Sequence, residues 1–107
     1  MPISPSPSLH TLTNGVRIVA LPTAALATST VAVFIRSGSA HEPKLINGIS
    51  HVVEHMLFKG TATRDARRIN VDAEKLGADV NAHTDRDHTA FFLRCLLEHS
   101  GEFAYLF

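Results

Sequence analysis

The spacing of the apolar residues changes along this chain of 107 residues. Residues 16–20 and 28–37 are extended runs rich in β-branched residues, and from residue 79 to residue 97 the apolar residues recur with a period of two, which is typical of β-strands. Between these segments Ile49, Val52, Val53 and Met56 follow the i, i+3, i+4, i+7 spacing of an amphipathic helix. The sequence therefore predicts an α+β fold, an antiparallel sheet with helices packed on one face.

Turn residues separate the expected strands. Asn14-Gly15 lies between two extended runs and predicts a β-hairpin. A long strand over residues 28–37 would place the β-branched Val31, Val33 and Ile35 on one face. A second hairpin is expected around residues 85–87. Its apolar face would then consist of alternate residues of its second strand: Thr89, Phe91, Leu93, Cys95 and Leu97.

The first expected helix covers residues 48–59. It would begin at Asn47-Gly48 and end at Gly60. Its apolar residues lie on one side, and we expect that side to be buried. The opposite side of the helix would then face a cleft.

Two further helices are expected. One would run over residues 64–76, with Thr63 as its N-terminal cap and Gly77 as its end. The other would open at residue 98 and continue through the apolar run that ends at Phe107. We expect the helix over residues 64–76 to be structural.

Composition excludes several classes of protein. The chain is 45% hydrophobic and 19% charged with a formal net charge of zero, which fits one globular domain and no second one. Without a basic patch, neither nucleic acid nor an anionic membrane surface is an expected partner. No apolar run approaches the length of a membrane span. The single cysteine, Cys95, cannot form an internal disulfide and is expected to be a buried thiol.

Residues 1–8 alternate proline and serine, which predicts a short disordered lead-in before a single domain over residues 9–107. The lead-in has no basic segment followed by an apolar one, as a secretory signal would have. No arginine precedes Arg17, whereas a mitochondrial presequence is rich in arginine. The expected location is therefore cytoplasmic.

The segment His51-Val52-Val53-Glu54-His55 carries the clearest chemical signal. On a helix, residues 51, 54 and 55 share one face, so both imidazoles can reach one cation with the carboxylate beside it. HxxEH reverses the HExxH zinc signature and is the inverzincin pattern. The spacing indicates metal-assisted hydrolysis. The alternative is an amphipathic helix that merely exposes two histidines and a glutamate.

The residues around this motif extend the pattern. The pattern has three parts along the chain: residues 48–61, Arg64, and residues 76–84 (Leu-Gly-Ala-Asp-Val-Asn-Ala-His-Thr). This arrangement resembles the N-terminal part of the zinc-binding domain of the M16 metallopeptidases, also called the pitrilysin or insulinase family. The resemblance runs from about Leu12 to the last residue. Val52 and Val53 stand where relatives often carry Phe and Leu, a conservative difference.

The resemblance implies a zinc-dependent endopeptidase. His51 and His55 would bind Zn²⁺, which lowers the pKa of a water molecule towards about 7. Glu54 would act as general base on that water and pass the proton to the leaving amine. A strand with the family's Asn-Ala-x-Thr pattern would bind an extended peptide through its main chain. In this sequence that strand is Asn81, Ala82, His83 and Thr84.

The resemblance also implies parts that lie outside the chain. Catalytic zinc has three protein ligands, and in the family the third is a glutamate several tens of residues after the HxxEH helix. We therefore expect residues 9–107 to be the N-terminal portion of an M16 domain, truncated before the third ligand and inactive alone. A second M16-like half or subunit would close around the peptide or protein substrate. The chain would be either a fragment of a longer peptidase or a stand-alone remnant.

Alternatives remain for the whole chain and for single residues. An M16-like scaffold or substrate-holding subunit would be noncatalytic, although such relatives typically lose part of HxxEH and this chain keeps all of it. His83, Asp85, Asp87 and His88 form a second group of ligand-type side chains, which we interpret as solvated residues at a hairpin tip. Asn81 has the alternative of bonding its own turn.

Overall fold

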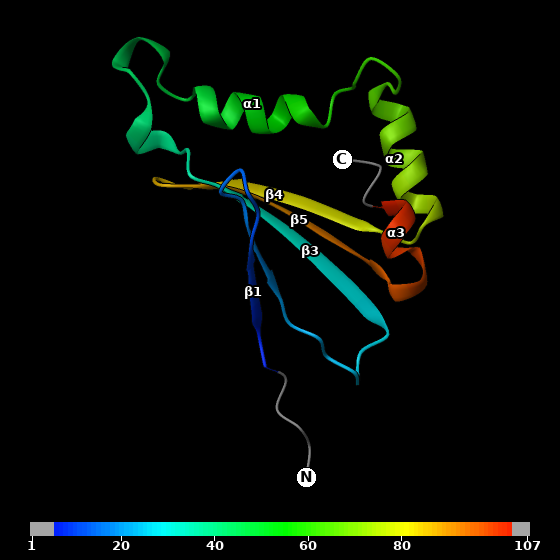
Figure 1. Ribbon diagram of the computed structural model, residues 1–107. Helices are drawn as coiled ribbons and strands as arrows, with labels where there is room; N and C mark the ends of the chain where they lie inside the picture. The colour runs from blue at the N-terminus through cyan, green and yellow to red at the C-terminus, as the bar shows by residue number, and fades with distance from the viewer. Residues whose placement is uncertain (1–5, 104–107) are drawn as a thin grey trace.

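A computed structural model describes residues 6–103, which form two antiparallel sheets and three α-helices (Figure 1). α1 and α2 lie on the same side of the larger sheet, so the predicted α+β architecture is confirmed. The smaller sheet pairs β1 (Ser8–Thr11) with β2 (Arg17–Ala20). The remaining elements are β3 (Thr28–Ile35), α1 (Ile49–Leu57), α2 (Ala66–Lys75), β4 (Asp79–Thr84), β5 (Thr89–Leu96) and α3 (Ser100–Phe103).

The larger sheet has the strand order β3-β5-β4, so β5 is central and β4 is an edge strand. On its helix side, Leu93 of β5 pairs with Val31 of β3 and Val80 of β4. Leu93 and Cys95 are the buried centre of this face, and Leu76, Ala78 and Val80 pack against them. The free thiol of Cys95 is thus a core group, as predicted.

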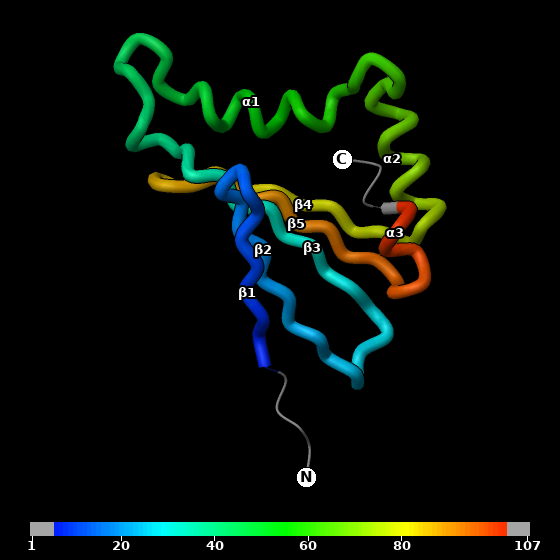
Figure 2. The backbone as a smooth tube through the Cα atoms, in the orientation of Figure 1, coloured from blue at the N-terminus to red at the C-terminus, as the bar shows by residue number. Residues whose placement is uncertain are grey.

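The β1–β2 hairpin lies apart from the helices. Its Leu12 amide donates to the Val16 carbonyl, and Gly15 adopts φ 88° at the tip, which confirms the turn predicted at Asn14-Gly15. Figure 2 shows the two strands side by side, running away from the side of the larger sheet that carries α1.

α2 is fixed at both ends by local hydrogen bonds. Asp65, not the predicted Thr63, is the N-terminal cap, since its Oδ1 accepts from the Arg68 amide at 2.7 Å. The reason is that Asp65 is held extended by a β-bridge to Gly60. At the other end Gly77 has φ 61°, and the Ala78 amide returns to the Ala73 carbonyl at 2.9 Å.

The apolar side of α1 is not buried as predicted. Val52 and Met56 are 54% and 59% exposed, and Ile49 and Val53 are exposed as well. The helix instead turns its opposite side toward β4, where Glu54 is only 9% exposed. An amphipathic pattern identifies the apolar side, but within residues 6–103 no element packs against that side of α1.

The chain exposes more surface than a compact protein of its size. Its accessible surface is 8626 Å², whereas a compact monomer of 11.6 kDa exposes about 5,800 Å². Its radius of gyration is 16.2 Å, against about 13 Å for a compact domain of this length. The exposed residues of β3 and α1 are therefore apolar surface that needs a packing partner.

Several predicted boundaries shift. Ser8, the last residue of the predicted lead-in, already belongs to β1, while residues 1–5 of that lead-in lie outside the described part. Leu97 was predicted on the apolar face of β5 but lies in a 3₁₀ turn and is exposed. The third helix begins only at residue 100, and residues 104–107 of its predicted course are not described. In residues 6–103 no helix is long and apolar enough to cross a bilayer.

Gly38 fixes the loop before α1 against the turn between β4 and β5. The Ser39 amide donates to the Asp85 carbonyl at 3.1 Å, and the Ala40 amide donates to the Arg86 carbonyl at 2.8 Å. A Cβ atom at residue 38 would overlap the Asp85 carbonyl oxygen, so only glycine allows this approach. The loop and the strand β4 that flank α1 are thereby held together.

Candidate metal centre

Three ligand-type side chains project from one face of α1. One ligand atom each from His51, Glu54 and His55 lies within 4.8 Å of the other two. The Nε2 atoms of the two histidines are 2.9 Å apart, and their ring centroids are 4.5 Å apart. Among the described residues this is the one group of three or more such side chains close enough to share an ion.

The geometry of the histidine pair fits zinc. Two nitrogen ligands that lie about 2.0–2.1 Å from one zinc ion are separated by about 2.8–3.4 Å at the usual bond angles. The distance of 2.9 Å between the two Nε2 atoms falls in this range. Imidazole nitrogen is also a preferred zinc donor. Both rings are exposed, so an ion from solvent can reach them.

Glu54 is held from the side of the sheet. Its carboxylate Oε2 accepts a hydrogen bond from the Thr84 hydroxyl, which lies on β4. This bond joins α1 to the edge strand and fixes one oxygen of the carboxylate, so that Oε1 is the oxygen left for other chemistry. Thr84 was predicted to contact a substrate, and the structure places it beside Glu54.

The other predicted substrate residues lie differently. Side chains alternate along β4, so Ala82 shares the face of Thr84, whereas Asn81 and His83 lie on the opposite face. Asn81 Oδ1 accepts from the Ala82 amide at 2.9 Å, which resembles the local backbone bond considered as the alternative for this residue. The structure therefore brings Thr84 to the histidine pair, and leaves His83 on the far side of the sheet.

Glu42 is a positioning residue that the sequence did not reveal. Its two carboxylate oxygens accept from the amide of Gly48, the N-cap, at 2.6 Å and from the amide of Ser50, in the first turn of α1, at 3.0 Å. Asn47, expected at the helix start, makes no cap, and Gly48 is the N-cap with φ 93°. The capping-box pattern relates residues that are three apart in the sequence. Glu42 lies six residues before Gly48, so this pattern does not identify it.

We expect Glu42 to make the stability of α1 depend on pH. The amides of Gly48 and then Ser50 lower the pKa of the Glu42 carboxyl. A carboxyl with a lowered pKa in the folded state stabilises the fold above its unfolded pKa, and this contribution is lost as the pH falls through the folded pKa. Glu42→Gln should therefore lower the melting temperature at pH 7 and lose this difference in acid.

Melting curves of the complete protein, followed by circular dichroism from pH 7 to pH 3, measure the effect. Glu74→Gln, an exposed change on α2, is the matched control and should melt like the parent at each pH. An equal difference between Glu42→Gln and the parent at pH 7 and pH 3 would contradict the capping role.

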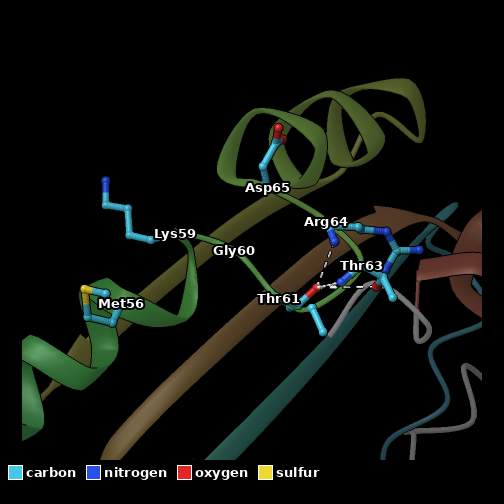
Figure 3. Close-up of a pocket in the computed structure, with 8 residues that line it drawn as sticks. Met56, Lys59, Gly60, Thr61, Thr63, Arg64 and Asp65 are labelled. Atoms are coloured by element: carbon cyan, nitrogen blue, oxygen red, sulfur yellow. Dashed lines mark hydrogen bonds between the residues drawn. The ribbon is translucent and has the colours of Figure 1, made fainter.

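Two hollows flank α1. A cavity of about 580 Å³ lies beyond its C-terminal end, where Thr61 Oγ1 accepts from the Arg64 amide (Figure 3). It contains none of the predicted site residues. A smaller cavity of about 260 Å³ lies beside His51 and Thr84, with Glu42 and Asp85 also in its wall. We take the smaller one as the approach to the histidine pair, because it is the one that reaches a candidate ligand.

Comparison with known proteins identifies the family. Residues 17–104 match the family model described as insulinase, peptidase family M16. The chain belongs to the M16 peptidase family. This confirms the resemblance drawn from the HxxEH segment and the residues around it.

Individual relatives agree with this assignment. The chain is 43% identical over 92 residues to the uncharacterized zinc protease YmxG of Bacillus subtilis, covering 86% of this chain and 22% of that protein. It is 40% identical over 95 residues to the mitochondrial-processing peptidase subunit beta of Dictyostelium discoideum, covering 88% of this chain and 20% of that protein.

A solved structure has a similar fold. A protease from Helicobacter pylori is similar with a TM-score of 0.88 and 28% identity, over 98% of this chain and 26% of that one. The chain thus spans only about a fifth to a quarter of the length of these three proteins.

Proposed function

We propose that the protein containing this chain is a zinc-dependent endopeptidase in which His51 and His55 hold the metal and Glu54 is the general base. The observation that carries the proposal is the grouping of two imidazole nitrogens 2.9 Å apart with a buried carboxylate, in a member of the M16 family. The name of the Bacillus relative, a zinc protease, supports both the metal and the reaction.

Each side chain has a part in this chemistry. Zinc, when bound, would polarise the scissile carbonyl and lower the pKa of a water molecule to about 7. His51 and His55 must be neutral imidazoles to offer their Nε2 lone pairs. Glu54 takes the proton of the attacking water on Oε1, holds it, and gives it to the leaving amine. Thr84 orients the carboxylate through Oε2.

The proposed site requires one more ligand. Catalytic zinc is usually held by three protein side chains, and residues 6–103 group only Glu54 with the histidine pair. If Glu54 is the base, the third ligand comes from outside these residues. We propose that the remaining part of the protein supplies it, and that a second M16-like half or subunit completes the substrate chamber. The name of the Dictyostelium relative, subunit beta of a processing peptidase, supports such a partner.

We propose that the substrate binds along β4 as an added strand. β4 is an edge strand, so the N–H and C=O groups along one of its sides make no hydrogen bonds to another strand of the sheet. The Asp85 amide pairs with His88 across the turn. Because amides alternate in direction along a strand, the amide of Ala82 points to the free edge, where it donates to Asn81 Oδ1 and where a bound peptide would replace Asn81 as the acceptor. Main-chain pairing there would bind many sequences and place the peptide beside Thr84 and Glu54.

Peptide hydrolysis before and after metal removal tests the proposed function. We expect the complete protein to cleave internal bonds of an unstructured peptide, to stop when zinc is removed by a chelator, and to recover when zinc is restored. Cleavage that survives complete removal of metal would contradict the proposal. Metal-replete protein that binds the peptide without cleaving it would favour the alternative, a noncatalytic substrate-holding subunit.

Ala82→Pro should weaken peptide binding about fivefold, since it removes one main-chain donor worth on the order of 1 kcal/mol. The fold should persist, because this amide does not pair with β5 and the preceding residue is already extended. His83→Ala changes only a side chain on the other face and should weaken binding less. Peptide affinity is measured in the Glu54→Gln background to prevent cleavage. Equal effects of the two changes, with unchanged circular dichroism, would contradict strand addition.

A further inference from the structure

A second histidine pair lies on the face of the larger sheet that points away from α1. His83 is on β4 and His88 directly precedes β5, so the two rings meet beside the turn that joins these strands. Their Nε2 atoms are 3.2 Å apart, and their rings are 5.3 Å apart at 84°. We call these two residues the hairpin histidine pair. Neither residue belongs to the group on α1.

Asp87 fixes the orientation of His88. Its Oδ1 lies 2.7 Å from His88 Nδ1. Because a carboxylate can only accept, this nitrogen carries the ring proton and donates a hydrogen bond to the carboxylate. With the proton on Nδ1, the neutral ring presents the Nε2 lone pair toward His83. A carboxylate behind the outer nitrogen is the usual support of a metal-binding histidine.

Aromatic contacts hold both rings. His83 stacks on Phe92 of β5 with ring centroids 5.3 Å apart and an interplanar angle of 25°. His88 lies 6.0 Å from the ring of Phe34 on β3. Phe34 and Phe92 also contact each other edge to face. The hairpin histidine pair therefore packs on side chains of β3 and β5, which are rigid elements, and not on a flexible loop.

We propose that the hairpin histidine pair is a second metal site, which binds a divalent transition-metal ion through Nε2 of His83 and Nε2 of His88. Two nitrogens 3.2 Å apart fit metal–nitrogen bonds of about 2.0–2.1 Å at an angle of about 100°. His83 would then carry its ring proton on Nδ1, and water would fill the other positions. Because the donors are two imidazoles, the site should bind Cu²⁺ more tightly than it binds Ni²⁺ or Zn²⁺.

This site does not depend on the proposed peptidase function. Thr84 contacts Glu54 on the helix side of β4, whereas His83, the preceding residue, lies on the opposite face. An ion on the hairpin pair would therefore be bound even if the histidines of α1 held none. The alternative is a simple N–H···N hydrogen bond between the rings, which predicts no metal binding.

Copper titration of the complete protein separates these alternatives. His51→Ala/His55→Ala is used as background, so that the α1 pair cannot contribute. We expect one Cu²⁺ per chain at the hairpin pair, with nitrogen couplings in the electron paramagnetic resonance spectrum. His83→Asn and His88→Asn should each weaken this binding at least tenfold. Asp87→Asn should weaken it about tenfold or more, the usual effect of losing such a support. His10→Ala, on β1, should leave it unchanged.

Stability provides a second readout. Cu²⁺ should raise the melting temperature of the background protein but not that of His83→Asn or His88→Asn in the same background. If one variant unfolds without metal, the other still decides the question. Unchanged affinity in both folded variants, or a copper spectrum without nitrogen coupling, would overturn the proposal and leave only the hydrogen bond between the rings.

Discussion

Glu54→Gln is expected to lower peptide hydrolysis by at least about a hundredfold while zinc stays bound, the usual effect of removing a general base. The side chain is nearly the same size and its carbonyl oxygen can still accept from the Thr84 hydroxyl, so the contact between α1 and β4 is kept. The amide cannot take a proton from water. The two histidines that would hold zinc are unchanged, so metal content should remain that of the parent.

Zinc content and hydrolysis are measured together on the complete protein. Glu74→Gln, on α2 and exposed, is the matched control and should behave as the parent does. Unchanged turnover in Glu54→Gln would remove Glu54 from the base role. Loss of zinc in parallel with loss of activity would instead make Glu54 a ligand, which its position near both histidines also allows.

The candidate metal centre could be predicted where the relevant geometry is local. Residues four apart on a helix lie one turn apart, so the approach of His51 to His55 follows from their spacing alone. The same holds for the hairpin at Asn14-Gly15 and for the end of α2 at Gly77, because each depends on one backbone conformation that glycine favours.

Contacts between distant segments were not predictable. Thr84 and Glu54 are thirty residues apart in sequence and meet only because β4 lies at the sheet edge under α1. Glu42 reaches the first turn of α1 across a loop. No periodicity or capping pattern encodes such contacts, since they depend on how elements pack.

The exposed side of α1 shows a different limit of sequence patterns. Val52, Val53 and Met56 were correctly placed on one side of the helix, but the prediction that this side is buried was wrong for residues 6–103. The pattern indicates that this side of α1 has an apolar packing partner. In the described residues, however, the side of α1 that faces the sheet is the one that carries Glu54. The chain covers about a fifth of its curated relatives, so we propose that other parts of the protein pack there.

Removing either histidine of the α1 pair should abolish hydrolysis and tight zinc binding. Changing a supporting residue of a metal site already costs about 10–100-fold in affinity, and loss of a direct ligand costs more. His51→Ala and His55→Ala remove one donor each from a pair whose nitrogens lie 2.9 Å apart. Since both rings are exposed, the substitutions should not disturb the fold. His10→Ala is the control, because this histidine lies on β1, away from α1.

The most direct test is the zinc retained by the complete protein after gel filtration, measured beside peptide hydrolysis in the same samples. We predict about one zinc per chain in the parent and in His10→Ala, and less than about a tenth of that, with only background hydrolysis, in His51→Ala and His55→Ala. Both histidine variants retaining zinc and activity, or a parent that cleaves peptides without tightly held zinc, would contradict the account.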